Sequence, residues 1–436
     1  MTSRDHNVAY SSISPVGTFI IVFLLLAPTM ISGEAVTSEQ NASSSSNSAS
    51  LQELDLLRVE HYLYLTASQD VGVFHVRFSF PPDYEYQAPL LLEFYNDTTS
   101  SALLHYQIEN DSEAPNKIIN FTMGLMNKGD KVLLHFSCWV LVKNHDFSDL
   151  PKYVKIPRTC QLPQETKTWL VATKEVQVHS IVIRHAAKEL HGWSDNLVRY
   201  ADRIAFFIRH HRFGLFLIEL HLGLLLSQDA RTTLFINGEN VGRSHLACAL
   251  FRTYDIPARV LLANNDQGFW TQMHYMVEYY APGYGWVLVE TTKGKSPYAT
   301  KHQVINRVCY PKDEQDTKRD YILPLMTGEE RWLWIDTPQV SPTYSNLVND
   351  SKSQMFTEAN VTVDQLGADY AFILTQVVFR AYQNYLGMNL TGDNLLHFQN
   401  ATSLQHDALN ALTEHNTTGY VSCLTQASEE YQKIIL

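Results

Sequence analysis

One stretch of the sequence, from Gly238 to Thr292, constrains the fold of this 436-residue chain more than any other. Its first third predicts a loop that runs into a buried helix. Apolar residues between Leu246 and Tyr254 recur at helical spacing, and Ile256-Pro257 then ends the pattern. Its last third predicts a β-hairpin, so this one stretch supplies both a helix and a sheet to the same core.

The hairpin is indicated by two runs rich in β-branched and aromatic residues, 274–280 and 286–292, with Pro282-Gly283-Tyr284-Gly285 as the turn. In a symmetric turn, His274 lies on the same face as Glu290, one diagonal step away, at roughly 7–8 Å between backbones. The Glu290 carboxylate can then fix the tautomer of His274, as in the base-and-orienter half of a catalytic triad. A nucleophile is expected at the start of the preceding helix, where the dipole and free N–H groups lower a thiol's pKa.

Two motifs of this stretch resemble those of transglutaminase-like domains within the papain-like cysteine enzymes. That family has Gly-x-Cys before a helix ending in R-x-x-G-I-P-A-R, then H-x-W/Y-x-E-x-Y-x-P-G-Y-G-W and a closing Asp. Residues 252–259, RTYDIPAR, match the helix end, and residues 282–286, PGYGW, match the turn. Asp255 stands for the family's glycine and Met276 for its aromatic residue. The resemblance implies a papain-like core.

The resemblance also implies the site residues. It places Gly238 on the family's glycine, His274 on its histidine, Glu290 on its aspartate and Asn240 on its nucleophilic cysteine. An amide nitrogen is not a nucleophile, so His274 cannot activate it as it would a thiol. Because the members of a triad act as a unit, loss of the nucleophile alone removes nearly all of the catalysed rate. The positions Asn240, His274 and Glu290 therefore imply the family's fold without its acyl-transfer chemistry.

Other interpretations of these residues remain open. Cys248, eight residues beyond Asn240, could act as a nucleophile, although its apolar neighbours favour a buried small hydrophobe. His274 and Glu290 could form a satisfied polar pair and nothing more. Gln228, twelve residues before Asn240, is a candidate for a polar group beside an oxyanion.

The N-terminal part of the chain predicts export. Residues 1–35 have the pattern of a signal peptide, with Arg4 before the apolar run Phe19–Ala27 and small residues after it. Because the run is interrupted by Pro28 and is short for a membrane span, we expect cleavage, with an N-terminal signal anchor as the alternative. Residues 36–50 are rich in serine and predict a flexible linker.

Nine N-x-Ser/Thr sequons support an extracellular or cell-surface glycoprotein. They begin at Asn41, Asn96, Asn110, Asn120, Asn349, Asn360, Asn389, Asn400 and Asn416. The net charge of −12 argues against a nucleic-acid partner. The papain-like groove that the resemblance implies binds extended peptides, so we expect a protein or peptide ligand, and membrane contact only through an N-terminal anchor.

The flanking regions predict two further domains around the core. Residues 51–160 alternate apolar and polar side chains in short runs, which indicates an antiparallel, immunoglobulin-like β-sandwich. Residues 161–340 form the predicted transglutaminase-like domain, with a helix over 195–211 capped by Ser194 or Asp195. Its histidines lack the i, i+4 spacing of a helical metal pair, so neither a metal nor a cofactor is predicted.

Residues 341–436 predict a helical C-terminal region. The strand-like Trp332–Ile335 is expected to end the core domain, and Ser341 to Asn360 is interpreted as a polar connection. Three helices are then expected, over residues 368–386, 403–414 and 421–435. They predict a helical hairpin or three-helix cap closing over the core, or alternatively a dimerising helix pair.

Five cysteines occur at positions 138, 160, 248, 309 and 423. In an exported protein one disulfide is expected, and the odd count leaves at least one free thiol. Cys138 with Cys160 is the candidate pair, which the sequence does not establish.

Together these patterns predict an α+β chain: a papain-like transglutaminase core, preceded by an antiparallel β-sandwich and followed by a helical C-terminal region. The function favoured is that of an exported, catalytically inactive binding or structural module. The first alternative is an active cysteine peptidase, amidase or protein-glutamine acyltransferase. The second is an adhesive cell-surface protein that acts through its β-domain.

Overall fold

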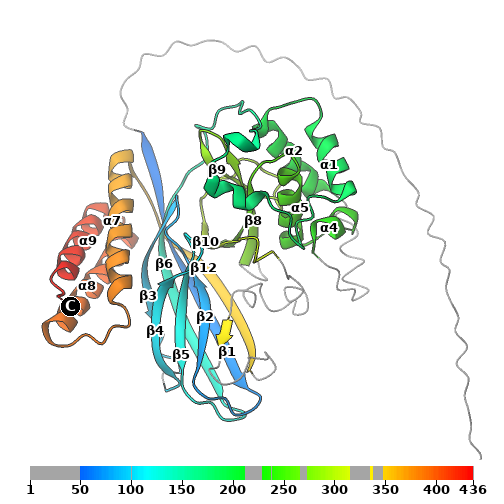
Figure 1. The fold of residues 1–436 in the computed structure, drawn as a ribbon. Helices are drawn as coiled ribbons and strands as arrows, with labels where there is room; N and C mark the ends of the chain where they lie inside the picture. The colour runs from blue at the N-terminus through cyan, green and yellow to red at the C-terminus, as the bar shows by residue number, and fades with distance from the viewer. Residues whose placement is uncertain are drawn as a thin grey trace, which may run out of the picture. The chain divides into compact units, whose positions relative to one another are not determined.

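The computed structural model describes residues 50–99, 101–211, 228–236, 238–265, 273–314, 334–336 and 347–435. The described elements form a β-sandwich, a smaller mixed domain with its own sheet, and three C-terminal helices (Figure 1). The predicted mixed α+β architecture with antiparallel sheets is confirmed.

The sandwich has two sheets, and every strand pairing in them is antiparallel. The first, in spatial order, consists of β12 (Leu347–Asp364), β1 (Leu51–Ala67), β6 (Lys131–Lys143) and β3 (Gln87–Phe94). The second consists of β11 (Trp334–Asp336), β2 (Phe74–Phe80), β5 (Lys117–Met123) and β4 (Leu103–Asn110). Every second side chain of a strand points into the space between the two sheets. There, Phe78 of β2 and Phe121 of β5 both contact Phe136 of β6. Their ring centroids lie 5.7 Å and 5.4 Å from it.

Two strands of the sandwich come from the far side of the core in sequence, which corrects the sequence interpretation. The stretch interpreted as a polar connection, Ser341 to Asn360, instead supplies most of β12, which pairs with β1 from Leu51↔Asp364 to Ala67↔Leu347. β12 lies at the edge of its sheet, and over residues 352–364, where burial is described, the buried side chains are Met355, Ala359 and Val361. An edge strand buries little on either side, so its sequence is polar. Likewise, β11 pairs with β2 and does not end the core.

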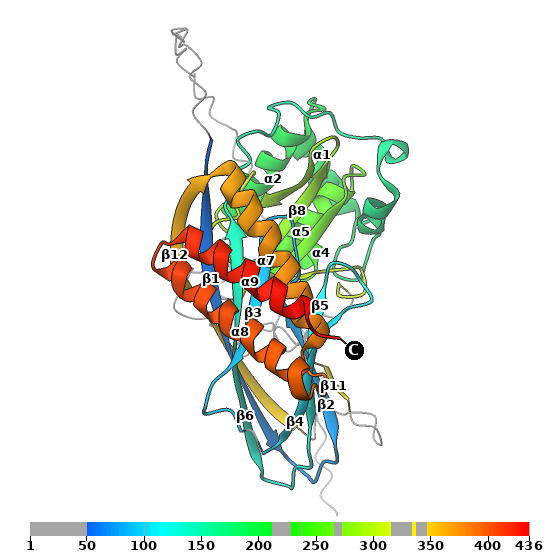
Figure 2. The ribbon, with the colours of Figure 1, turned by 90° about the vertical axis from the view of Figure 1, so that its left-hand side faces the viewer.

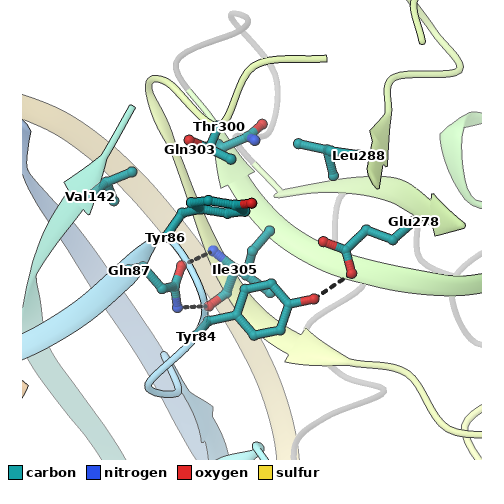
Figure 3. Close-up of a pocket in the computed structure, with 9 residues that line it drawn as sticks. All are labelled: Tyr84, Tyr86, Gln87, Val142, Glu278, Leu288, Thr300, Gln303 and Ile305. Carbon is teal, nitrogen blue, oxygen red and sulfur yellow. Dashed lines mark hydrogen bonds between the residues drawn. The ribbon is translucent and has the colours of Figure 1, made fainter. Parts of the chain in front are cut away.

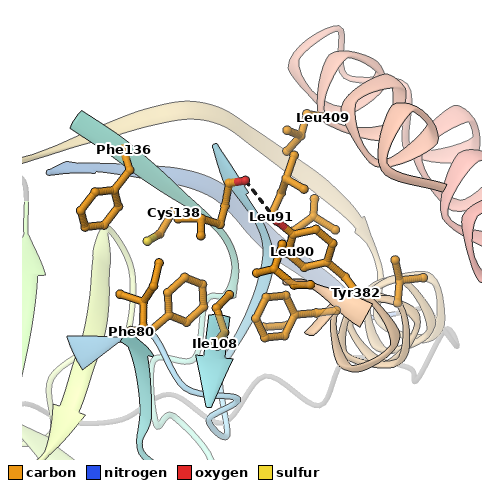
Figure 4. Packing of buried hydrophobic residues seen from close by; sticks show 14 of the residues in the cluster. Phe80, Leu90, Leu91, Ile108, Phe136, Cys138, Tyr382 and Leu409 are labelled. Atoms are coloured by element: carbon orange, nitrogen blue, oxygen red, sulfur yellow. Dashed lines mark hydrogen bonds between the residues drawn. The ribbon is translucent and has the colours of Figure 1, made fainter. Parts of the chain in front are cut away.

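The three C-terminal helices are α7 (Gln365–Tyr385), α8 (Gly392–Thr413) and α9 (Thr417–Gln432) (Figure 2). Their apolar faces share one hydrophobic cluster with the sandwich, as Figure 4 shows for Tyr382 and Leu409 beside Leu90 and Leu91. The Tyr382 hydroxyl donates to the Leu92 carbonyl at 3.2 Å. The expected cap over the core is therefore wrong, because the helices cover the sandwich.

The core domain has a sheet of four strands and several helices before it. In spatial order the sheet consists of β10 (Gln303–Val308), β7 (Ala258–Asn265), β8 (Met273–Ala281) and β9 (Gly285–Val289). The helices are η1 (Thr159–Gln161), η2 (Gln164–Leu170), α1 (Ile181–His191), α2 (Leu197–His210), α4 (Ala230–Ile236) and α5 (Asn240–Arg252). The central helix α5 is buried from Val241 to Arg252, in agreement with the apolar pattern of this stretch.

The cap of α2 differs from the expected one. Asn196, not Ser194 or Asp195, precedes the helix, and its side-chain oxygen accepts from the Val198 N–H at 3.1 Å. Asp195 is used elsewhere, since its carboxylate accepts from the Tyr153 hydroxyl at 2.9 Å. Several good capping residues stand in a row here, and tertiary contacts decide which one caps the helix.

Two amide side chains of the sandwich join it to the core sheet, because each one pairs with both backbone groups of a residue on β10. Gln87 bonds both the N–H and the carbonyl of Ile305, each at 2.8 Å, and Asn116 does the same to Val308. Figure 3 shows Gln87 beside a cavity of about 20 Å³, where the Tyr84 hydroxyl donates to Glu278. Such a cavity has room for one water molecule.

Cys138, Cys160, Cys248 and Cys423 are free thiols in the structure. Cys138 lies in the sandwich core and Cys160 is exposed on η1, so the suggested bond between them is not formed. Across the described ranges, no helix combines the length and the apolar character that a membrane crossing requires. The predicted signal segment, residues 1–35, lies outside the described residues.

Candidate active site

The start of α5 is held by Gln228, which precedes α4. Its side-chain oxygen accepts from the backbone N–H groups of Glu239 at 2.8 Å and Gly242 at 3.1 Å. Its backbone carbonyl bonds Nδ1 of His245 at 2.9 Å. Gln228 thus lies beside the helix start, as its position in the sequence suggested. Because backbone donors already engage its oxygen, its role in the structure is to position that helix start.

Gly242 is required for this arrangement. A Cβ at this position would lie 2.4 Å from the Gln228 side-chain oxygen and 2.5 Å from the hydroxyl of Thr233. Gly238 is similarly confined, since a Cβ there would lie 2.6 Å from the same hydroxyl. Glycine allows the backbone to approach a side chain that closely. These contacts fix where the first turn of α5 presents Asn240.

The hairpin brings the other two predicted residues to the same place. β8 and β9 pair with Tyr280 opposite Trp286 and Val277 opposite Val289, which is the register expected from the turn. Glu290 directly follows β9 and forms a two-bond bridge with Lys295, at 3.0 Å in each direction. This bridge continues the strand by one residue, so the Glu290 side chain keeps the orientation that the hairpin gives it.

The structure places Asn240, His274 and Glu290 in one chain of contacts. Nδ2 of Asn240 lies 3.3 Å from Nδ1 of His274, and Nε2 of His274 lies 2.6 Å from a carboxylate oxygen of Glu290. The other carboxylate oxygen accepts from the Thr292 N–H at 2.8 Å. The His274 and Glu290 side chains are 13% and 2% exposed, so this pair is shielded from water.

The electrostatics favour an ionised Glu290. Burial by itself raises the pKa of Glu290, but the hydrogen bonds from His274 and Thr292 outweigh it, so the net pKa is lowered. Arg243, whose own pKa burial lowers, is close enough to feel the charge of Glu290. Its Nε donates to the Gly238 carbonyl at 3.1 Å. An ionised Glu290 accepts the Nε2 proton of His274, which leaves Nδ1 as the acceptor for the Asn240 amide.

Cys248 cannot take the place of the missing thiol in this geometry. It is fully buried within α5, and this burial raises the pKa of its thiol well above the ordinary value. Ser244, one turn after Asn240, is also buried, and its single hydroxyl proton lies within reach of the carbonyls of Asn240 and Tyr275, at 2.9 Å and 3.2 Å from Oγ. Neither side chain is both exposed and next to His274.

Sequence reasoning missed Arg243 and the supporting role of Gln228. Arg243 stands within a helix pattern without any motif around it, and only the fold shows that it approaches Glu290. Among the described residues, no group of histidine, cysteine and acidic side chains is arranged to hold a metal ion. The site is therefore built from hydrogen bonds between an amide, an imidazole and a carboxylate.

Comparison with known proteins matches one part of the chain to a family and its fold to a solved structure. Residues 224–291 match the family model described as the transglutaminase-like superfamily, and they carry a domain of that type. The fold is similar to that of a "putative cysteine protease" from Cytophaga hutchinsonii, at a TM-score of 0.50 and 13% identity. That match covers 70% of this chain and 92% of the other.

A second solved structure, a "putative protease" from Parabacteroides distasonis, matches at a TM-score of 0.22 and 14% identity, over 52% of this chain and 42% of the other. No curated protein matches the chain significantly. The chain is thus a mixed α+β protein with a transglutaminase-like core and a helical C-terminal region.

Proposed function

We propose that this chain is a transglutaminase-like protein that has lost its nucleophile and binds a peptide or protein segment without cleaving it. The observation that carries the proposal is the 3.3 Å contact between Nδ2 of Asn240 and Nδ1 of His274. In the family that the motifs resemble, a thiol is expected at this point. The amide instead offers an N–H donor to the ring and no lone pair that can attack a carbonyl.

The hydrogen bonding around His274 supports a catalytically inactive site. In an active cysteine enzyme the imidazole takes the thiol proton and forms an ion pair with the thiolate. Here Asn240 donates to one ring nitrogen while Glu290 accepts from the other, so a neutral ring satisfies both contacts. The arrangement keeps the shape of a catalytic site and lacks the atom that would form a covalent bond to substrate.

The ligand we propose is a segment of extended peptide. Papain-like grooves bind such segments through backbone hydrogen bonds and apolar contacts, which need no thiolate. Export and glycosylation belong to the same proposal and rest on the sequence of residues 1–35 and on the nine sequons. An exported binding module would meet its protein partner at or outside the cell surface.

Restoring the thiol tests the lost-nucleophile proposal. We expect the Asn240→Cys variant to react with iodoacetamide at position 240 at least ~10-fold faster than an ordinary thiol, because His274 and the start of α5 favour its thiolate. The rate is read by peptide mapping, with the native, exposed Cys160 as the internal reference. Adding His274→Ala should remove most of the excess in rate over Cys160, leaving only the part due to the start of α5. Equal rates at positions 240 and 160 in the single variant would contradict the proposal.

The alternative is an active enzyme that uses Cys248, and it predicts turnover by the native chain. We instead expect the native chain to show no hydrolysis or acyl transfer with peptide and glutamine-amide substrates, because Cys248 is fully buried. Turnover by the native chain that disappears in Cys248→Ala would establish the alternative. Turnover that survives in that variant but needs His274 would also exclude the binding-only function.

A further inference from the structure

One face of α7 exposes apolar residues that no other described element covers. Its solvent-exposed positions follow one another at spacings of four and three residues. They are Leu366, Tyr370, Ile373 and Val377, followed by the polar Arg380 and Asn384. The four apolar side chains, here named the α7 seam, are 80%, 53%, 56% and 45% exposed. Single exposed apolar residues are ordinary, but a continuous stripe of four marks an interaction surface.

The opposite face of α7 is packed against the sandwich and α9, so the helix cannot rotate to bury the seam instead. Phe372 and Phe379 are buried there, and Phe379 stacks on Phe80 of β2 with ring centroids 5.6 Å apart. Thr375 and Tyr382 bond Tyr420 of α9 and the Leu92 carbonyl of β3. Because α7 is held on this side along its length, rotation of the helix cannot hide the seam. Figure 2 shows α7 lying across the surface of the sandwich next to α9.

The spacing of the seam is that of a coiled-coil contact. Residues that recur at alternating steps of four and three lie along one line of a helix and meet the same line of a second helix. Side chains that flank such a line usually choose the partner through their charges. Here the flanking positions Leu374, Gln376, Ala381 and Gln383 are uncharged. Asp369 is already paired with Lys143 at 2.9 Å. The flanks therefore do not repel a second identical helix.

We infer that the α7 seam binds the seam of a second copy of this chain, with the two helices antiparallel about a two-fold axis. Centring the axis on the apolar stripe places Leu366 opposite Val377 of the second copy, and Tyr370 opposite its Ile373. Leu366 and Ile373 then occupy d positions of a heptad, and Tyr370 and Val377 occupy a positions. Each layer of the contact pairs an a residue with a d residue, as antiparallel coiled coils do. The surface is self-complementary, which a two-fold contact requires.

Charge selects the antiparallel direction. In this register Arg380 reaches the end of the partner helix where Asp364 caps it, so each end of the contact joins a cation to an anion. The Arg380 side chain is 61% exposed, and its Nε contacts Asp83 at 3.3 Å, which leaves other N–H groups for a second acceptor. A parallel pair would instead bring the two copies of Arg380 together. Like charges at that distance oppose association.

Four residues a side make a small interface, and the dimer should be correspondingly weak. Stable protein interfaces bury more surface than the roughly three helical turns of this seam offer. We therefore expect a reversible monomer–dimer equilibrium and not a permanent assembly. This inference does not depend on the chemistry of the Asn240 site.

Sedimentation of the full chain over a range of concentrations tests the contact. We expect a concentration-dependent dimer, and at least a ~10-fold weaker association for Ile373→Asp, because the substitution buries a charge in the central layer. Leu125→Asp is the matched control, since Leu125 is 74% exposed in a loop of the sandwich and should not affect association. Unchanged thermal unfolding of both variants shows that they fold. A monomer at every concentration, or a dimer unaffected by Ile373→Asp, would overturn the inference.

Cross-linking determines the direction of the helices. Tyr370→Cys and Ile373→Cys are made separately in a background of Cys160→Ser and Cys423→Ser, which removes the native thiols that are not buried. Antiparallel pairing predicts that a mixture of the two variants forms a disulfide between chains far more readily than either variant alone. Cross-linking of each variant with itself would show parallel pairing and reject the proposed register. Failure of all three samples to cross-link would reject the contact itself.

Discussion

The Glu290 carboxylate is the residue through which the site responds to pH. Its pKa is lowered in the folded chain, mainly because the bonds from His274 and Thr292 outweigh its burial. A lowered pKa means that its stabilising contribution is present above the ordinary pKa of a glutamic acid and is lost as the pH falls through the folded value. The site should therefore weaken in acid and hold at neutral pH.

Glu290→Gln measures that contribution. At pH 7 we expect the free energy of unfolding to fall by about 2 kcal/mol, the size of a buried hydrogen bond to a charged group. Below about pH 4.5 the difference between native and variant chains should shrink, since the unfolded chain then takes up a proton that the folded carboxylate, with its lowered pKa, does not yet bind. Urea unfolding at several pH values checks this. A difference that stays constant from pH 7 down to about pH 3 would mean that the charge of Glu290 is unimportant.

Residues near in sequence were placed well by sequence reasoning. His274 and Glu290 share one hairpin, so the turn alone fixes their register, and the motif then located Asn240 at the start of the helix. The partners of Gln228 could not be foreseen, because they depend on how closely Gly242 lets the backbone approach. The proximity of Arg243 to Glu290 likewise follows from the packing of α5 against the hairpin.

At the level of elements, the end of α5 is fixed by an ion pair that is fully buried. Arg252 donates two hydrogen bonds to Glu314, at 2.8 Å and 2.7 Å, and both side chains are 0% exposed. Arg252 also donates to the Ala258 and Val171 carbonyls, which ties the helix to the start of β7 and to the segment after η2. The helix that carries Asn240 is thus anchored at its far end.

Removing one partner of this pair should be costly. We expect Arg252→Gln to lower the free energy of unfolding by about 3–5 kcal/mol, because it leaves the Glu314 carboxylate buried without its cation. Arg184→Gln, on the exposed side of α1, is the control and should change stability by less than about 0.5 kcal/mol. Urea unfolding compares them. Equal stabilities of the two variants would show that the buried pair contributes little.

The sequence predicted elements with strong periodicity and missed one without it. The long C-terminal helices α7 to α9 were predicted from their amphipathic patterns. The surface that they cover was not predicted, since an apolar helix face does not indicate which surface it packs against. β12 was not predicted as a strand because an edge strand has few buried side chains, and because its partner β1 lies about 300 residues earlier in the chain. Pairing over such a distance leaves no local signal.

For the molecule as a whole, the sandwich is completed only by residues that follow the core. β12 pairs with β1 along its full length, and the C-terminal helices share the hydrophobic cluster of the sandwich. A chain that ends at residue 340 would expose β1 as an edge and uncover the apolar residues under α7. We expect it to lose cooperative thermal unfolding, as followed by circular dichroism.

Complementation provides the control for that truncation. Co-expression of residues 341–436 as a separate chain should restore cooperative unfolding, because the missing strand and helices can pair in trans. Should the truncated chain unfold cooperatively at the temperature of the full chain without this fragment, β12 and the helices would be dispensable. The amide contacts of Gln87 and Asn116 would then be sufficient to hold sandwich and core.

In the structure the Asn240 amide faces one nitrogen of His274, and the Glu290 carboxylate holds the other. Long-range ¹H–¹⁵N NMR of His274 tests this arrangement most directly, since it reports which ring nitrogen carries the proton. We predict, at a pH where the ring is neutral, a proton on Nε2 and a hydrogen-bonded acceptor at Nδ1, with the Nδ1 signal changed by Asn240→Ala. A proton on Nδ1, or a ring signal indifferent to both Asn240→Ala and Glu290→Gln, would contradict the account.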